Sequence, residues 1–190
     1  MILLIDNFDS FTYNIAYALG TLGQDIRVFR SNAVTTHEIE QLNPGAIFIS
    51  PGPGRPEDSG ISCEVIEQFS GKIPIMGVCL GHQCIGQVFG ANVNQADIPV
   101  HGKTSSVFHD GKTIFKGLPD GFKATRYHSL IVEKDSVPEQ LSVSAQTDSG
   151  MVMGIRSEKL KVEGVQFHPE SIATKTGTQL FQNFLDYYCA

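Results

Sequence analysis

Tryptophan is absent from this sequence of 190 residues, and no apolar run approaches the ~20 residues that a membrane-spanning helix needs. Basic residues are few and scattered, because 14 Lys and Arg stand against 20 Asp and Glu, a net charge of -6. Without a basic cluster, nucleic acid and anionic membrane surfaces are poor partners. We therefore expect a soluble protein with no nucleic-acid and no membrane partner.

The cysteines lack the spacing of a disulfide framework or a zinc site, since the chain contains no C-x-x-C pair. The four positions are Cys63, Cys79, Cys84 and Cys189. The apolar N-terminus is short and has no basic region before it, so it predicts a first strand rather than a signal peptide. These features favour a reducing cytoplasm and give no reason to expect a metal or cofactor in this chain.

The first half of the chain alternates buried-strand patterns with helical patterns. This rhythm predicts an α/β fold with a doubly wound, mostly parallel central sheet flanked by helices, and the length favours one domain over residues 1–190. Asp9 or Ser10 is expected to cap the first helix and Gly23 to end it, while Thr35 and Glu38 match a capping box. The expected strands are residues 2–5, 26–29, 46–50 and 73–78, and the expected helices are residues 11–22, 35–42, 61–69 and 82–89.

The second half changes to short strands beyond Gly90. Residues 103–109, followed by Asp110-Gly111, predict a β-hairpin. These antiparallel strands either extend the same sheet or form a small one beside it. Further strands are expected at residues 123–127, 130–133, 141–146, 151–155 and 162–166, and a last helix at residues 177–188.

The stretch Gly77-Val-Cys-Leu-Gly81 follows an apolar run and precedes a helical segment. This pattern is typical of a nucleophile elbow, in which two glycines allow a sharp turn that lifts the residue between them off the sheet. Cys79 would then lie at a helix N-terminus, where the helix dipole favours a thiolate. The alternative is a buried cysteine without chemistry.

A nucleophilic thiolate needs a base and a group that orients the base. His168 follows the expected strand 162–166, and Glu170 is two residues further on, so in an extended segment both side chains share one face. Cys79, His168 and Glu170 would then form a triad. His82 is the rival base, although the elbow favours a packing or polar role for it. His101 and His128 are intermediate cases, and His37 and His109 stand in ordinary surface contexts.

The same chemistry needs two amides at an oxyanion. The amide of Leu80, directly after the nucleophile, is the expected first donor. The loop Pro51-Gly-Pro-Gly54 comes after a strand and could bring the second, although a plain tight connection explains that loop equally well.

Several motifs in register resemble the triad-type (class I) glutamine amidotransferases, essentially from end to end. Within that family the sequence is most similar to the glutaminase subunits of anthranilate and aminodeoxychorismate synthases. The motifs are Asp6-Asn-Phe-Asp-Ser-Phe-Thr12, Pro51-Gly-Pro-Gly54, Gly77-Val-Cys-Leu-Gly-His-Gln83, His101-Gly-Lys-Thr-Ser105, Arg126-Tyr-His-Ser-Leu130 and Gly164-Val-Gln-Phe-His-Pro-Glu-Ser171.

This resemblance implies that Cys79 attacks the side-chain amide of L-glutamine, that His168 passes the proton to ammonia, and that Glu170 orients His168. It also implies a partner, a chorismate-binding synthase subunit in a heterodimer or heterotetramer, with Mg²⁺ in that partner rather than in this chain. The segment Asn7 to Thr12 and the loop at Pro51 would face the partner. The glutamine-binding residues implied are Gly52, Pro53, Gly54, Leu80, Gln83, Ser129 and Leu130.

The choice between anthranilate and aminodeoxychorismate is made outside this chain. Gly54 favours anthranilate slightly, because some aminodeoxychorismate relatives carry Cys there, and one subunit could serve both synthases. Two other classes of protein stay open: a different cysteine hydrolase or peptidase, and an interaction module whose core cysteine is inert.

Overall fold

The computed structural model describes residues 1–189, with only the backbone at Asp97 and Ile98. Its centre is a nine-stranded sheet in the order β2-β1-β3-β4-β9-β8-β7-β5-β6. The first five strands in that order are parallel and the remaining pairings are antiparallel. The parallel strands are β1 (Ile2–Asp6), β2 (Ile26–Arg30), β3 (Ala46–Ile49), β4 (Ile75–Val78) and β9 (Val162–Val165).

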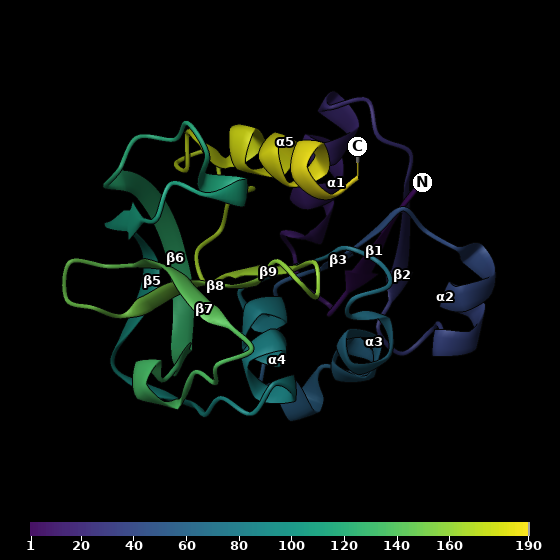
Figure 1. Ribbon diagram of the computed structural model, residues 1–190, viewed down its shortest axis with the longest axis horizontal. Helices are drawn as coiled ribbons and strands as arrows, with labels where there is room; N and C mark the ends of the chain where they lie inside the picture. Colours follow the sequence, from purple (N-terminus) through teal and green to yellow (C-terminus); the bar gives the residue numbers. More distant parts are fainter. Residues whose placement is uncertain (190) are drawn as a thin grey trace.

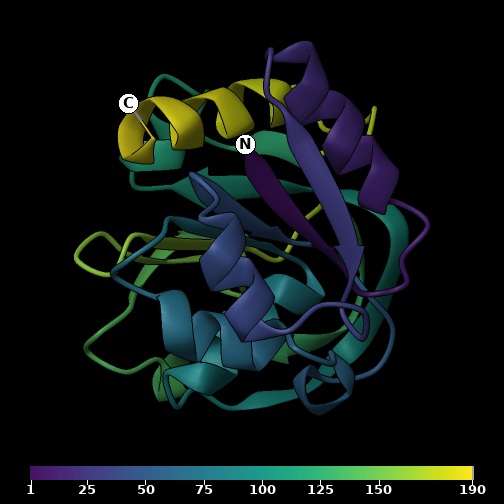
Figure 2. The same ribbon diagram turned by 90° about the vertical axis from the view of Figure 1, so that its right-hand side faces the viewer.

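Helices cover both faces of the parallel strands, as expected from the sequence (Figure 1). On one face lie α1 (Thr12–Thr21) and α5 (Gly177–Tyr188), which run side by side at the top of both views (Figures 1 and 2). On the other face lie α2 (Thr36–Leu42), α3 (Ser62–Phe69) and α4 (Leu80–Val88). Each face has its own apolar core, one containing Leu19 and Phe184 and the other Val65 and Ile85.

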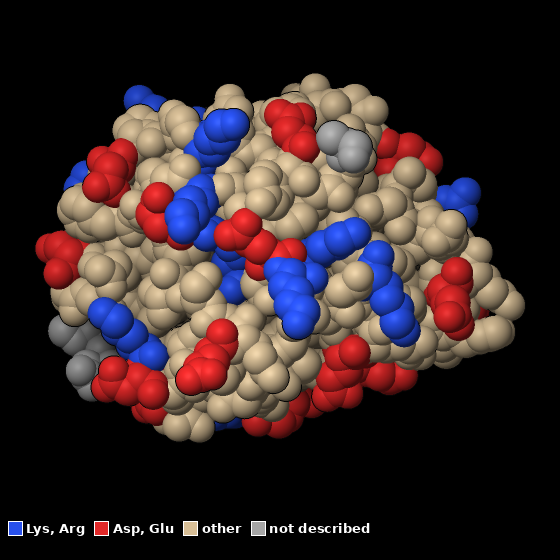
Figure 3. Space-filling view, viewed as in Figure 1, with Lys and Arg blue, Asp and Glu red and all other residues tan. Residues whose placement is uncertain are grey.

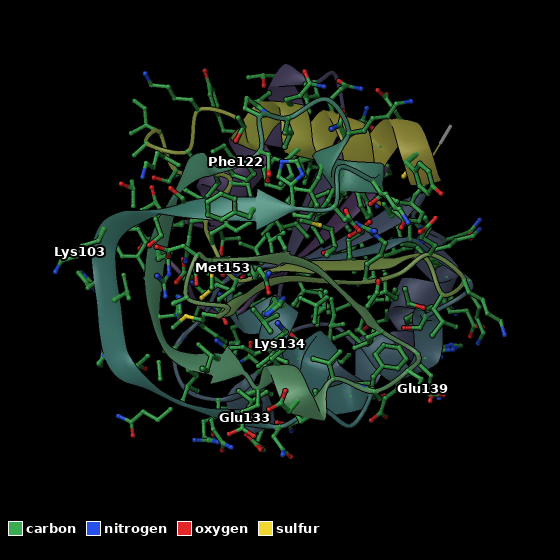
Figure 4. The ribbon with its side chains drawn as sticks, turned by 60° about the vertical axis from the view of Figure 1, so that its left-hand side comes forward. Lys103, Phe122, Glu133, Lys134, Glu139 and Met153 are labelled. Atoms are coloured by element: carbon green, nitrogen blue, oxygen red, sulfur yellow. The ribbon has the colours of Figure 1, made fainter. Side chains whose placement is uncertain are left out.

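The antiparallel strands extend the same sheet, which was one of the two expected arrangements. They are β5 (Val93–His109), β6 (Phe122–Val132), β7 (Ser142–Gln146) and β8 (Val152–Ser157). The strand β5 bends where its pairing with β6 shifts register, and Lys103 projects from that bend away from the body of the protein, whereas Phe122 and Met153 are buried (Figure 4). The prediction missed residues 93–102 of β5 and split β6 into two strands.

The predicted β-hairpin after residues 103–109 is present in its strand pairing, but Asp110-Gly111 does not form a two-residue turn between the strands. β5 and β6 do pair, but a connection of several turns joins them and contains the 3-10 helix η2 (Thr113–Phe115). Two further 3-10 helices are η1 (Pro56–Asp58) and η3 (Lys134–Ser136). Asp110 instead accepts hydrogen bonds from Arg156 of β8, at 2.7 and 3.0 Å. The carboxylate of Asp110, which the local sequence predicted to be a turn residue, thus binds the buried guanidinium of Arg156.

The helix ends agree with the sequence in two of three cases. The capping box is present at α2, where Thr35 and Glu38 bond reciprocally. Gly23 follows α1 with a positive φ of 76°, a conformation that suits glycine. The predicted cap of α1 was wrong, because its N-cap is Phe11 and no side chain caps it. Asp9 accepts from the amide of Phe11 instead, before the helix begins.

Charges of both signs are mixed on the face seen in Figure 3. Among residues 1–189, no helix combines the length and the apolar character needed to cross a membrane.

Candidate active site

Cys79 occupies a strained turn between β4 and α4. Its φ of 53° and ψ of -100° lie outside the backbone regions that residues other than glycine normally adopt. The flanking glycines make the turn possible: a Cβ at Gly77 would lie 2.5 Å from the backbone of Gly81, and a Cβ at Gly81 would lie 2.5 Å from the carbonyl oxygen of Ile49. Any larger residue at either place would push the turn off the sheet. The predicted nucleophile elbow is therefore present.

His168 lies beside the elbow because β9 is the direct neighbour of β4. The two strands are parallel and Val78 pairs with Val165, so both chains leave the sheet at the same edge. The amide of His168 donates to the carbonyl of Thr125 in β6 at 2.9 Å, which holds the segment in place. Its Nδ1 lies 2.5 Å from Oε1 of Glu170, and both side chains are buried. The carboxylate accepts, so Nδ1 carries a hydrogen and Nε2 points away from Glu170.

The electrostatics of His168 depend on its two neighbours. Burial alone would lower its pKa, but the Cys79 sulfur and the Glu170 carboxylate outweigh burial and raise the pKa of His168 to about 10. Nε2 has no hydrogen-bond partner within residues 1–189, although the sulfur is close enough to influence its pKa. The structure thus brings the three predicted residues together, with Nε2 free to exchange a proton.

His82 lies in α4 and is fully buried. Its ring faces Gly164 of β9, where a Cβ would lie only 3.1 Å from its Nδ1. Burial lowers the pKa of His82 to about 3. It is therefore neutral, and it occupies a packing position rather than the position of a base.

The remaining histidines have different surroundings. His128 is buried, and its pKa is lowered to about 4 by burial and by the Arg126 cation. His101 is exposed and its ring packs edge-on against Tyr127 at 5.2 Å between centroids. His37 is exposed, and His109 stacks on Phe115 at 4.9 Å.

A cavity of about 210 Å³ opens at Cys79. Six of the seven residues expected to bind glutamine line it, and they come from the β3–η1 loop, α4 and β6. The lining residues are Gly52, Pro53, Gly54, Cys79, Gln83, Tyr127, His128, Ser129 and Leu130.

Leu80, the seventh, does not line the cavity with its side chain, but it is the first residue of α4. Its amide therefore has no acceptor within the helix. The loop before η1 packs tightly on this point, because a Cβ at Gly52 would lie 2.7 Å from Leu80 Cδ2 and 2.6 Å from Asn7 Cβ. Only glycine lets the loop approach so closely. The loop at Gly52 and the start of α4 thus lie against each other beside Cys79.

Gln166 was not predicted from the sequence. It is fully buried, it directly follows β9, and its Nε2 lies 3.6 Å from Cys79 Sγ. Phe11 and Tyr127 were not singled out either, yet their rings lie 5.7 and 5.2 Å from the ring of His168. The pairing of β4 with β9 could have pointed to Gln166, because the residue after Val165 must lie opposite the residue after Val78. Among the described residues, no three His, Cys, Asp or Glu side chains gather as a metal site would require.

The fold and this geometry define the class of protein: an α/β enzyme with a cysteine at a nucleophile elbow. The chain belongs to the class I glutamine amidotransferases, since the family model "Glutamine amidotransferase class-I" matches residues 3–187. It is therefore a glutamine amidotransferase, as the resemblance of its motifs implied.

Proteins with similar sequences match this chain over nearly its whole length. The chain is 55% identical to "Aminodeoxychorismate/anthranilate synthase component 2" of Bacillus subtilis, covering 99% of this chain and 97% of the relative. It is 53% identical to "Anthranilate synthase component 2" of Cyanophora paradoxa, covering 98% of each. Among solved structures, a proposed GMP synthase component from Thermoplasma acidophilum superposes with a TM-score of 0.86 at 25% identity, covering 98% of this chain and 92% of that one.

Proposed function

We propose that this chain hydrolyses L-glutamine through Cys79, His168 and Glu170. The observation that carries the proposal is the buried His168–Glu170 pair beside a strained cysteine at the mouth of a cavity. The carboxylate of Glu170 holds one ring nitrogen of the imidazole, so only the other nitrogen, Nε2, can give a proton to a reacting group or take one from it. Nucleophilic catalysis requires this arrangement.

The thiolate of Cys79 attacks the side-chain amide carbon of glutamine, and a C–S bond forms while the carbonyl π electrons move to oxygen. The amide of Leu80 and one from the loop at Gly52 hold that oxyanion. His168 gives the Nε2 proton to the nitrogen, the C–N bond breaks, and ammonia leaves. Water then attacks the thioester carbon as His168 takes one of its protons. The C–S bond breaks, glutamate leaves, and the thiolate of Cys79 and the protonated His168 are restored.

Glutamine would bind in the cavity at Cys79. Gln83, Ser129, Leu130 and the loop from Gly52 to Gly54 surround it with amide and hydroxyl groups, which suit the charged α-amino and carboxylate groups of an amino acid. A volume of about 210 Å³ supports a small substrate rather than a peptide.

We further propose that the ammonia passes to a separate chorismate-binding synthase subunit. Apolar side chains crowd the surface near the His168–Glu170 pair, where Tyr17 is 76% and Ile172 is 98% exposed. They border a hollow of about 640 Å³ that Glu170 also lines. Such a surface favours a protein partner. Of the segment 7–12, Phe8 is half-exposed and would join this interface, whereas Asn7 and Thr12 are buried.

Ammonia release from glutamine tests the glutaminase step. We expect Cys79→Ser to lower it by at least ~10³-fold, because an alcohol is a much weaker nucleophile than a thiolate. Cys189→Ser, at an exposed cysteine, is the matched control. Full-speed ammonia release by Cys79→Ser would end the proposal. Amine release from peptides in place of ammonia would instead indicate a peptidase.

Co-purification with the synthase and product analysis with chorismate test the partner and the pathway. We expect anthranilate as the main product. Aminodeoxychorismate is the alternative, and both products would indicate a shared subunit. The isolated chain should be a poor glutaminase, because the partner helps to align the oxyanion site. High turnover that does not change when the synthase is added would contradict this partner-dependent activity.

A further inference from the structure

Gln166 touches the sulfur that would react. It is buried, and its Nε2 lies 3.6 Å from Cys79 Sγ. The sulfur also lies 3.8 Å from the carbonyl oxygen of Tyr127, which can accept a hydrogen from the thiol but can give nothing to a thiolate. An N–H aimed at sulfur stabilises the thiolate over the thiol. Which atom of the Gln166 amide faces the sulfur therefore matters.

The direction of that amide can be deduced from the hydrogen bonds around the carbonyl oxygen of Leu130, which two side chains share. A guanidinium only donates, and Nε of Arg126 lies 3.0 Å from Nε2 of His128, so that nitrogen of His128 must accept. The hydrogen of the neutral imidazole is then on Nδ1, which donates to the carbonyl oxygen of Leu130 at 2.9 Å.

The same carbonyl of Leu130 lies 3.2 Å from the side-chain amide of Gln83. A carbonyl only accepts, so the Gln83 atom facing it is Nε2. The second hydrogen of this Nε2 goes to Gln166 at 3.1 Å, and the Gln166 atom that receives it must be Oε1. The remaining amide atom of Gln166, its Nε2, is thereby turned to the sulfur.

We propose that Gln166 is a further catalytic residue, which donates an N–H to the sulfur of Cys79 and stabilises the thiolate before glutamine binds. Gln83 is a positioning residue, because its Nε2 donates to the Leu130 carbonyl and to Gln166 and thereby sets the direction of the Gln166 amide. Arg126 fixes only the tautomer of His128, which donates to the same carbonyl. The inference rests on the proposed role of Cys79 as nucleophile. The other titratable groups around this site are Tyr127 and His128 of β6, His82 of α4, and His168 and Glu170 after β9.

Alkylation of Cys79 by iodoacetamide tests the proposal, since only the thiolate reacts. The rate would be measured against pH on the whole chain, with residue 79 followed by peptide mass spectrometry. Gln166→Met keeps the length and removes the N–H, and we expect its profile to move up by about one pH unit, which lowers the rate near neutral pH about tenfold. Gln166→Glu places an acceptor at the sulfur and should move the profile further.

Gln179→Met, on the exposed side of α5, should leave the profile unchanged. A wild-type profile in folded Gln166→Met or Gln166→Glu would overturn the proposal. If neither variant folds, an NMR pH titration of the wild-type chain tests the proposal. The signal of one glutamine side-chain amide should shift with the same pH midpoint as the alkylation rate. The absence of such a signal would contradict the N–H contact.

This readout needs no glutamine and no partner. Ammonia release that persists in Cys79→Ser would refute the proposed function while the alkylation profiles still reported on Gln166. Conversely, an inactive Cys79→Ser together with unshifted Gln166 profiles would refute only this inference.

Discussion

The Nδ1–H of His168 donates to Oε1 of Glu170 across 2.5 Å, between two side chains that solvent does not reach. Pro169 stands between them in a turn, in which the amide of Ser171 donates to the carbonyl oxygen of His168 at 3.3 Å. The expected extended segment was therefore wrong, and a turn brings the two side chains together. The carboxylate thus fixes one tautomer and one ring orientation of the imidazole. Catalysis and stability should both depend on this contact.

Glu170→Gln should lower ammonia release by ~10²–10⁴-fold with little change in KM, because the amide no longer selects the tautomer that leaves Nε2 available. The measurement is glutamine-dependent ammonia release in the complex with the synthase. Glu40→Gln, at an exposed position on α2, is the matched control. Equal activity of the two variants would mean that Glu170 does not orient the base.

The same pair predicts a pH dependence of stability. Cys79 and Glu170 outweigh burial and raise the pKa of His168 from 6.5 to about 10, so the folded state holds this proton more tightly than the unfolded state. The resulting stability is complete below about pH 6.5 and disappears as pH rises through 10. The free energy of unfolding of the wild type should exceed that of Glu170→Gln by ~2 kcal/mol near pH 6, a gap that narrows toward pH 10. Urea titrations at several pH values measure it, and a constant gap would contradict the linkage.

Gly81→Ala should destabilise the protein by ~3 kcal/mol or more, because its Cβ would lie 2.5 Å from the backbone oxygen of Ile49. Gly20→Ala in α1 is the matched control, since the nearest atom to its Cβ would be 4.0 Å away. Alanine there should stabilise the helix by ~0.5–1 kcal/mol. Thermal unfolding compares the two, and similar shifts would contradict the close approach at the elbow.

Arg156→Met should destabilise the protein by ~3–5 kcal/mol near neutral pH, because the buried Glu163 must then either stay charged without its cation or take up a proton. Arg156 donates to Glu163 at 3.0 Å, and Thr113 and Tyr188 also bond this carboxylate. Burial raises the pKa of Glu163 to about 7, although Arg156 opposes this shift.

The folded state therefore binds the Glu163 proton more tightly, and this carboxyl lowers stability as pH rises from 4.5 to about 7. The defect in Arg156→Met should accordingly be smaller at acidic pH, and Glu163→Gln in the same chain should reverse most of it. Urea unfolding of the single and double variants measures both effects. A defect that the second substitution does not change would show that the charge of Glu163 is not its cause.

Local sequence patterns predicted the parallel half of the fold well, because each strand and helix there has its own apolar period and its own end signals. Thr35 with Glu38, and the apolar side of residues 177–188, are examples. The antiparallel half was harder to predict. Asn94, Gln95 and Gly102 interrupt any alternation in β5, and the strand persists there because β6 pairs with it. The sequence around Asp110 is typical of a turn, and only the folded structure shows that its carboxylate pairs with Arg156.

The sequence alone determined the elbow at Cys79 and the nearness of His168 to Glu170, because glycine spacing and a separation of two residues act locally, although a turn and not an extended segment joins the pair. Only the tertiary structure decided that the two motifs meet, and that Gln166 faces the sulfur. Both outcomes depend on the pairing of β9 with β4. This pairing brings together Cys79 and Gln166, which are 87 residues apart along the chain. Such a pairing is selected by the packing of the whole sheet, and no local pattern of residues encodes it.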